Sequence, residues 1–273
     1  MRLLSVQDAL LFRFRLIIPA FFSNFVEICI YKMINQNKYR FQFKQFGIND
    51  NNCAMKIGTD GVLLGAWADI YNSKNVLDIG AGSGLISLMI AQRCNANVLG
   101  IEIDTHAATE ATENVNQSPW NNRIQIINED FVKWAANNNR ISKFDHIISN
   151  PPFFKSGPSA PIMTRAIARH DSSLGYEQLL KLSSPLLNDD GRISIISPYD
   201  RKDDIIFYCD IINLHISRMT IVYSKTNGNP VRILWEICKK KRPLTQSNIS
   251  IRDNNNEYSV EYINLTKDFY LKF

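Results

Sequence analysis

From Asn75 onward, short apolar runs alternate with segments whose apolar residues recur at helical spacing. The apolar runs have the length and composition of buried strands: VLDIG, VLGIE, IQIIN, HIIS and RISIIS. Alternation of this kind is typical of βαβ units, in which right-handed helical crossovers join parallel strands. The pattern therefore predicts an α/β domain built on a parallel sheet.

The pattern changes after Asp200. A helical segment, KDDIIFYCDII, is followed by two long apolar runs, HISRMTIVYS and RILWEICKK. The linker KTNGNP between these runs is rich in turn-forming residues, so they predict an antiparallel hairpin at one edge of the sheet. The expected fold is a Rossmann-like sheet of seven strands that ends in a C-terminal β-hairpin.

The first 32 residues do not continue this pattern. Their apolar run LIIPAFFSNFVEICIY is short for a membrane span and is interrupted by Pro19 and Glu27. Met33 then opens a segment that reads like a new start. We expect residues 1–32 to be an extension outside the working domain and residues 33–273 to form one domain.

The composition is that of a soluble globular protein with a mildly basic balance. The formal net charge is +5 and the sequence pI is about 8.9, which is compatible with a nucleic-acid partner without requiring one. A basic run, CKKKRP, follows the last strand-like segment. It is either a solvated strand end or an edge that contacts phosphates.

The five cysteines are scattered, contain no CxxC pair and do not cluster with the four histidines. This distribution argues against a zinc site and against a disulfide framework. We therefore expect a cytoplasmic protein in a reducing compartment, with no metal and no membrane partner.

A glycine-rich loop, DIGAGSG, lies between the first strand and its helix. Gly80 and Gly82 let a ligand approach the backbone, and Glu102 ends the next strand, where a carboxylate can bind both ribose hydroxyls. The GxGxG spacing weakens the dinucleotide reading and suits S-adenosyl-L-methionine as the cofactor. Asp78 at the start of the motif can hold the loop or the ammonium group of that ligand.

The segment NEDF ends the third strand and should lie beside the adenine pocket. Asp130 can accept a hydrogen bond from the adenine amino group, and Phe131 can pack on the ring. Asp130 can equally cap the next helix, and the two roles are compatible.

The segment SNPPFF ends the fourth strand, at the edge where a doubly wound sheet binds its ligand. The Asn150 side-chain oxygen and the Pro151 carbonyl can each accept one N–H of an exocyclic adenine amine. These bonds favour a pyramidal nitrogen and direct its lone pair toward the methyl donor. Phe153 can stack on the target base.

The glycine loop and the NPPF corner resemble the amino-methyltransferases that carry the motif (N/D)PP(Y/F). Further segments are similar to the bacterial tRNA1(Val) (adenine-37-N6)-methyltransferase family over about Lys38 to Phe273: FQFKQFGINDNNCAMKIGTDGVLLGAW, ARHD, KTNGNPVRILWE and YSVEYINLTKDFYLKF. The commoner motif is NPPY, so Phe153 keeps the ring and lacks the hydroxyl.

The resemblance implies a role for each matching residue. Lys56, Thr59 and Asp60 would close over the methionine end of the cofactor. Gly80, Gly82, Glu102 and Asp130 would contact the cofactor, and the corner from Asn150 to Phe153 would be catalytic. A tRNA anticodon loop would be the substrate, in contact with Pro152, Phe154, Arg165, Arg169, His170 and Arg232. Arg165 and Arg232 could equally be ordinary surface residues.

Two other functions remain open. A glutamine methyltransferase that acts on release factors also uses an NPP(Y/F) corner, but the region before Lys56 is short for the helical substrate domain of that family. A non-catalytic RNA-binding factor with a relic cofactor fold is the second alternative. The intact residues Gly80, Gly82, Glu102 and Asn150 argue against such decay.

We predict that residues 1–32 are dispensable, because they precede every motif named above. A chain that starts at Met33 should remain soluble, bind S-adenosyl-L-methionine and methylate RNA like the full chain. Circular dichroism compares the folding of the two chains, and calorimetry compares their binding of S-adenosyl-L-methionine. Loss of folding in the shorter chain would show that the extension is structural.

Overall fold

The computed structural model describes residues 39–138, 143–152 and 174–273, and its compact unit spans Phe41–Phe273. The expected extension, residues 1–32, lies outside the described residues. In chain order the elements are β1 (Phe41–Gln42), β2 (Gly47–Ile48), α3 (Thr59–Trp67), β3 (Asn75–Ile79), α4 (Leu85–Arg93), β4 (Asn97–Glu102), α5 (Thr105–Asn116), β5 (Ile124–Asn128), α6 (Phe131–Asn138), β6 (Phe144–Ser149), α8 (Tyr176–Leu186), β7 (Leu187–Pro198), the short helix η1 (Tyr199–Arg201), α9 (Lys202–Ile211), β8 (His215–Lys225), β9 (Pro230–Cys238), β10 (Thr245–Arg252) and α10 (Val260–Thr266).

The described part of the chain forms one large sheet of eight strands, in the order β10-β8-β9-β7-β6-β3-β4-β5. Strand β9 runs antiparallel to β7 and β8, and the other neighbours are parallel. The chain moves outward from β3 to β4 and β5 and then returns to β6 on the other side of β3. The topological switch point therefore lies between β3 and β6.

The Rossmann-like fold expected from the sequence is confirmed, and all seven predicted strands are present. The sheet has one strand more, because β10 pairs in parallel with β8 and places the predicted hairpin one position in from the edge. The first four residues of β10, whose sequence is TQSNISIR, are all exposed. Such a polar edge strand has no apolar run by which the sequence could reveal it.

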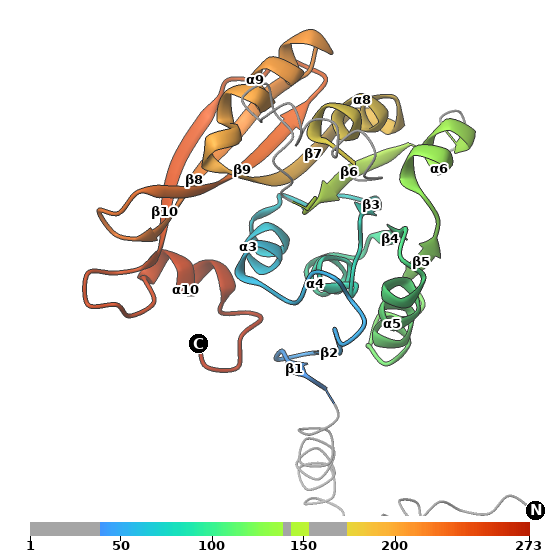
Figure 1. Cartoon of the computed structure of the whole chain (residues 1–273), viewed down its shortest axis with the longest axis horizontal. Helices are drawn as coiled ribbons and strands as arrows, with labels where there is room; N and C mark the ends of the chain where they lie inside the picture. Colours follow the sequence, from blue (N-terminus) through green and yellow to red (C-terminus); the bar gives the residue numbers. More distant parts are fainter. Residues whose placement is uncertain (1–38, 139–142, 153–173) are drawn as a thin grey trace, which may run out of the picture. The chain divides into compact units, whose positions relative to one another are not determined.

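The strands alternate between two apolar faces. Val76 on β3 and Ile148 on β6 belong to one core cluster, while their neighbours Leu77 and Ile147 belong to the other. Helices α3, α4 and α10 cover the first face, and α6, α8 and α9 cover the second (Figure 1). A strand buried on both faces reads as a continuous apolar run, which is why the central strands were easy to predict.

Helix α3 approaches α4 closely because two of its glycines lie four residues apart and share one face. A Cβ atom at Gly65 would lie 2.8 Å from Sδ of Met89, and one at Gly61 would lie 3.0 Å from Cδ2 of Leu85. The side chains of α4 fill the space that larger residues on α3 would need. This packing brings the first turn of α3 next to the loop that precedes α4.

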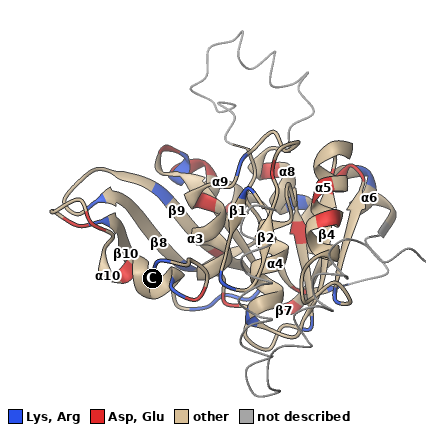
Figure 2. Cartoon of the chain, turned by 90° about the horizontal axis from the view of Figure 1, so that it is seen from below, with Lys and Arg blue, Asp and Glu red and all other residues tan. Residues whose placement is uncertain are grey.

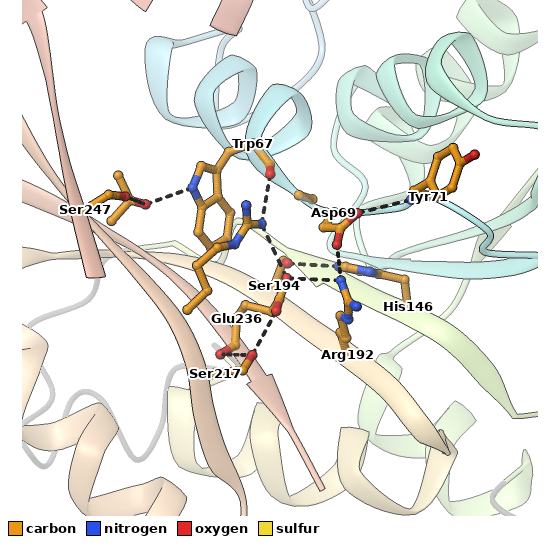
Figure 3. Close-up of polar contacts among 12 residues, drawn as sticks. Trp67, Asp69, Tyr71, His146, Arg192, Ser194, Ser217, Glu236 and Ser247 are labelled. Atoms are coloured by element: carbon orange, nitrogen blue, oxygen red, sulfur yellow. Dashed lines mark hydrogen bonds and ion pairs between the residues drawn. The ribbon is translucent and has the colours of Figure 1, made fainter. Parts of the chain in front are cut away.

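The C-terminal end of α3 is fixed to the sheet by a network of ion pairs and hydrogen bonds (Figure 3). Arg192 on β7 forms an ion pair with Asp69 and lies 3.7 Å from the carboxylate of Glu236 on β9. Arg218 on β8 pairs with Glu236 at 3.3 Å and donates to the Trp67 carbonyl at 3.0 Å. Removing one partner of such a pair leaves a buried charge uncompensated, so the network strongly specifies where α3 ends.

His146 on β6 lies beside this network and is 1% exposed. Its Nε2 atom lies 2.9 Å from the hydroxyl of Ser194, and no described residue binds Nδ1. Burial, together with the positive charge of Arg192, lowers the pKa of His146 from 6.5 to about 3. The ring is therefore neutral in the folded protein at physiological pH.

We predict that His146 makes folding sensitive to acid. Between pH 6.5 and about 3 the unfolded chain binds a proton that the folded ring does not, so stability is lost as the pH falls through this window. The slope from one such group is at most about 1.4 kcal/mol per pH unit. His146→Gln should remove this contribution, so the unfolding free energy of the variant relative to the parent, measured by urea denaturation, should rise as the pH falls across this range.

The matched control for this measurement is His106→Gln, which changes an exposed histidine on α5 and should keep the parent slope. A parent-like slope in His146→Gln would contradict the assignment.

Candidate active site

The register between β3 and β6 brings two predicted motifs together. Ile79 pairs with Ser149, so Gly80 and Asn150 are the next residues along two neighbouring strands. The Ser149 hydroxyl donates to the Ile79 carbonyl at 2.7 Å and ties the two strand ends to each other. The glycine loop and the NPP corner therefore begin side by side at the switch point.

A cleft of about 360 Å³ opens at this edge of the sheet. Its walls come from three regions that the sequence singled out: the KIGTDG segment, the glycine loop and the NPP corner. The lining residues are Met55, Lys56, Ile57, Gly58, Thr59, Asp60, Gly61, Gly80, Ala81, Gly82, Ser83, Leu85, Ile86, Asn150 and Arg232.

A larger hollow, about 540 Å³, lies at the opposite edge, where Asn75, Asn97 and Phe144 begin their strands. Arg123 in its wall is engaged by backbone carbonyls, including those of Ala96 and Ala91 at 2.9 Å each. None of the predicted site residues lines this hollow. The smaller cleft is therefore the candidate site, since it is the one at the switch point.

The glycine loop forms a cradle with an open outer side. Gly80 and Gly82 have φ values of +73° and +55°, which side chains rarely allow, and no described atom lies within 4 Å of a Cβ built on either residue. The amide of Gly80 donates to the Ile101 carbonyl at 2.8 Å, which anchors the loop to β4. The loop is thus anchored to β4, while its backbone stays accessible to a ligand on the outer side.

Glu102 holds the end of this loop that faces β4. Its two carboxylate oxygens accept the backbone N–H groups of Gly82 at 2.8 Å and Asp104 at 2.9 Å. Each oxygen has a second lone pair, so the carboxylate can still accept ribose hydroxyl groups. The side-chain amide of Asn128 donates to the carbonyls of Glu102 and Ile103 at 2.9 and 3.1 Å and steadies this strand end, a role that the sequence did not reveal.

Asp78 is fully buried beneath the loop. Its Oδ2 accepts the Ser87 hydroxyl at 2.7 Å, and no described residue binds Oδ1. Burial raises the pKa of Asp78 to about 7, and the nearby charge of Glu102 acts in the same direction. Of its two expected roles, this contact supports the first, which is to hold the loop against α4.

The segment before α3 is held in place by α5. Glu110 is 4% exposed and accepts the amides of Asn51 and the residue after it, at 2.9 Å each. Asn114 accepts the Asn49 amide at 3.0 Å and donates to the Ser83 carbonyl at 3.0 Å. Neither residue is among those predicted from the sequence, although two polar side chains on the buried stripe of an amphipathic helix are a detectable signal.

All six residues of the KIGTDG segment line the cleft, among them the predicted Lys56, Thr59 and Asp60. Lys56 donates to the carbonyls of Asp50 and Asn51 at 2.6 and 2.8 Å, and Thr59 is the exposed first residue of α3. Asp60 accepts the Nε–H of Arg232 at 2.9 Å. Arg232, which the sequence analysis assigned to RNA, is therefore part of the cleft wall.

At the NPP corner, Asn150 lines the cleft and its buried Oδ1 receives no hydrogen bond from a described residue. Pro151 is buried and Pro152 is exposed. The remaining predicted substrate residues, Phe153, Phe154, Arg165, Arg169 and His170, lie outside the described residues.

The NEDF segment joins the end of β5 to α6, whose first residue is Phe131. The carboxylate of Asp130 accepts the Val132 amide at 2.8 Å and so caps this helix, which is one of its two expected roles. Phe131 is 6% exposed and stacks on Trp134 at a centroid distance of 6.4 Å. Its ring belongs to the core, which leaves little of it to face an adenine.

The basic run after β9 is paired with the acidic residues near the start of β7. Lys240 lies 2.8 Å from the Asp190 carboxylate, and Arg242 lies 3.7 Å from it. This end of β9 is opposite to the end that carries Arg232, so the run is not beside the cleft. Figure 2 shows that acidic and basic residues are intermixed along the ribbon.

Three further expectations concern disulfides, metal sites and membrane-spanning helices. The cysteines among the described residues, Cys53, Cys94, Cys209 and Cys238, are all free. Within the same residues no cluster of three or more His, Cys, Asp or Glu side chains could hold a metal ion. The helices that the structure describes are all too short or too polar to cross a membrane.

The described residues form a Rossmann-like sheet, and its switch point carries a glycine loop, a glutamate at a strand end and an NPP corner. This combination is typical of methyltransferases. Residues 54–197 match the family described as methyltransferase small domain. A solved structure of a predicted O-methyltransferase from Agrobacterium tumefaciens shares the fold, with a TM-score of 0.61 at 19% identity over 77% of this chain and 96% of that one.

Curated relatives show to which methyltransferase family the chain belongs. A tRNA1(Val) (adenine(37)-N6)-methyltransferase of Bacteroides fragilis is 43% identical over 232 residues, which are 85% of this chain and 98% of the relative. A protein of the same name from Haemophilus influenzae is 42% identical over 238 residues, 85% of this chain and 99% of the relative. The chain belongs to the tRNA1(Val) (adenine(37)-N6)-methyltransferase family, as the sequence motifs indicated.

We predict that Glu102→Ala weakens binding of S-adenosyl-L-methionine. The change removes the ribose acceptor and also releases the Gly82 amide. Charge-assisted hydrogen bonds of this kind contribute about 1.5–3 kcal/mol, so Kd should rise roughly ten- to hundredfold. Calorimetry measures Kd, with Glu113→Ala, an exposed residue on α5, as the control. An unchanged Kd in Glu102→Ala would reject the ribose role.

Proposed function

We propose that this methyltransferase transfers a methyl group from S-adenosyl-L-methionine to the exocyclic N6 amine of adenine 37 in the anticodon loop of a tRNA of the tRNA-Val type. One observation carries the proposal. The unbonded acceptor Oδ1 of Asn150 lies in the same cleft as the glycine cradle. The curated relatives carry the name of this activity.

The residues of the cleft fit the proposed cofactor, which supplies an electrophilic methyl group on a sulfonium. Glu102 would bind the ribose hydroxyls, and the open backbone of Gly80 and Gly82 would lie along the ligand. Asp130 retains acceptor capacity beyond its helix cap and could receive the adenine amino group of the cofactor.

The NPP corner would activate the target amine. Asn150 Oδ1 and the Pro151 carbonyl would each accept one N–H, which holds the nitrogen lone pair toward the methyl group. As the N–C bond forms and the S–C bond breaks, the amine must lose a proton. Neither acceptor is basic enough to keep that proton, so it passes to water. Removing one such positioned group commonly lowers the rate about 10²–10³-fold.

An anticodon loop suits this site physically. Its single-stranded bases can be splayed out at low cost, and a net charge of +5 favours an RNA partner. Phe153 would stack on the flipped adenine, with Pro152 and Phe154 beside it, and Arg165, Arg169 and His170 would contact the loop. A tRNA substrate would place the reaction in the cytoplasm.

The deciding experiment is mass spectrometry of nucleosides from tRNA-Val, purified from cells with and without this protein. N6-methyladenosine at position 37 should disappear in its absence and return with the parent gene. If the modification persists, the proposal fails. Labelled methyl found on release factors instead of tRNA would favour the glutamine methyltransferase.

We predict that Asn150→Ala abolishes most methyl transfer while cofactor affinity stays nearly unchanged, because the residue serves the amine and not the cofactor. Single-turnover transfer of labelled methyl to tRNA should slow by about 10²–10³-fold. Asn150→Asp should be milder, since a carboxylate still accepts the bond.

Asn116→Ala, an exposed residue on α5, provides the matched control, and melting temperatures report on folding. Parent-like transfer by a well-folded Asn150→Ala protein would mean that the corner is only a strand terminus.

A further inference from the structure

The direction of β9 places an arginine at the site. Strand β9 is the antiparallel member of the large sheet, so its first residues lie at the edge where β7 and β8 end. Arg232 pairs there with Pro198 on β7 and Val222 on β8. Its side chain lines the cleft together with Gly80, Gly82 and Asn150.

In the wall of the cleft, Arg232 forms an ion pair with Asp60. Its Nε atom lies 2.9 Å from Oδ2 of Asp60, and the two side chains are 31% and 24% exposed. The cleft thus presents a positive and a negative charge next to each other. Lys56 is the other cation in the lining, and its ammonium group already donates to two backbone carbonyls.

The order of the strands fixes which end of a ligand would reach this pair. Glu102 ends β4 on one side of β3, whereas β6, β7 and β9 follow one another on the other side. A ligand whose ribose lies at Glu102 and whose reactive centre faces Asn150 would have Arg232, in the wall of the same cleft, within reach of its remaining end. In the cofactor proposed above, that end is an amino acid with a carboxylate and an ammonium group.

We propose that Arg232 binds the carboxylate at the amino-acid end of the methyl donor, beside Asp60, which the resemblance already assigns to that end and whose carboxylate would take the ammonium group. The inference rests on the proposed cofactor. A planar guanidinium matches a carboxylate in geometry, and the ion pair supplies both complementary charges at once. The pair also keeps both charges compensated when the ligand leaves.

The test compares two ligands on the same protein. S-Adenosylhomocysteine carries the amino acid, whereas 5′-methylthioadenosine has the adenosine and the sulfur without it. In calorimetric titrations, Arg232→Gln should weaken S-adenosylhomocysteine about ten- to hundredfold and leave methylthioadenosine unchanged. Asp60→Asn should show the same selective loss. Arg232→Lys should retain part of the affinity for S-adenosylhomocysteine, because lysine keeps the positive charge but lacks the paired N–H donors of the guanidinium.

Lys240→Gln is the matched control, since it removes one positive charge next to the other end of β9 and should change neither affinity. Equal losses for both ligands in Arg232→Gln would overturn the proposal and leave the ion pair as an anchor for α3, which a lower melting temperature would reveal. Unchanged affinities for both ligands would also overturn it and return Arg232 to the RNA surface. Failure of the parent protein to bind S-adenosylhomocysteine would instead contradict the proposed function itself.

Discussion

The parallel pairing of β3 with β6 is the constraint on which the site depends. It sets Ile79 opposite Ser149, and the residues that follow, Gly80 and Asn150, leave the sheet together. The helix after β3, α4, covers one face, and α8, the next described helix after β6, covers the other. A crevice opens where the chain departs to opposite faces, and the glycine loop and Asn150 line one cleft there.

The second wall of the cleft is built from a segment outside the large sheet. Helix α3 is fixed by its glycine face against α4, by the charge network at its C-terminal end and by the Asp60–Arg232 pair at its first turn. Glu110 on α5 holds the residues that lead into it. Because these anchors come from both ends of the sheet, the wall is positioned relative to β3, β6 and β9 at the same time.

Two buried titratable groups act on stability in opposite directions. Asp78 has its pKa raised from 3.8 to about 7, so the folded protein binds the extra proton in this window and stability from this group is lost as the pH rises. His146, with its pKa lowered to about 3, loses stability as the pH falls from 6.5. Their slopes oppose each other where the two windows overlap, so the net pH dependence of the parent protein there is smaller than either group alone would give.

The sequence by itself determined the parallel sheet, because strands buried on both faces must be continuously apolar and their helices periodic. It also located the glycine loop and Asn150 at the edge of the sheet that carries the cleft, since both are local motifs at strand ends. Only the tertiary structure decided that Arg232 faces Asp60, that Phe131 turns into the core and that the polar strand β10 joins the edge. Those outcomes depend on strand direction and on contacts between distant segments. The periodicity of apolar residues along the sequence does not show such contacts.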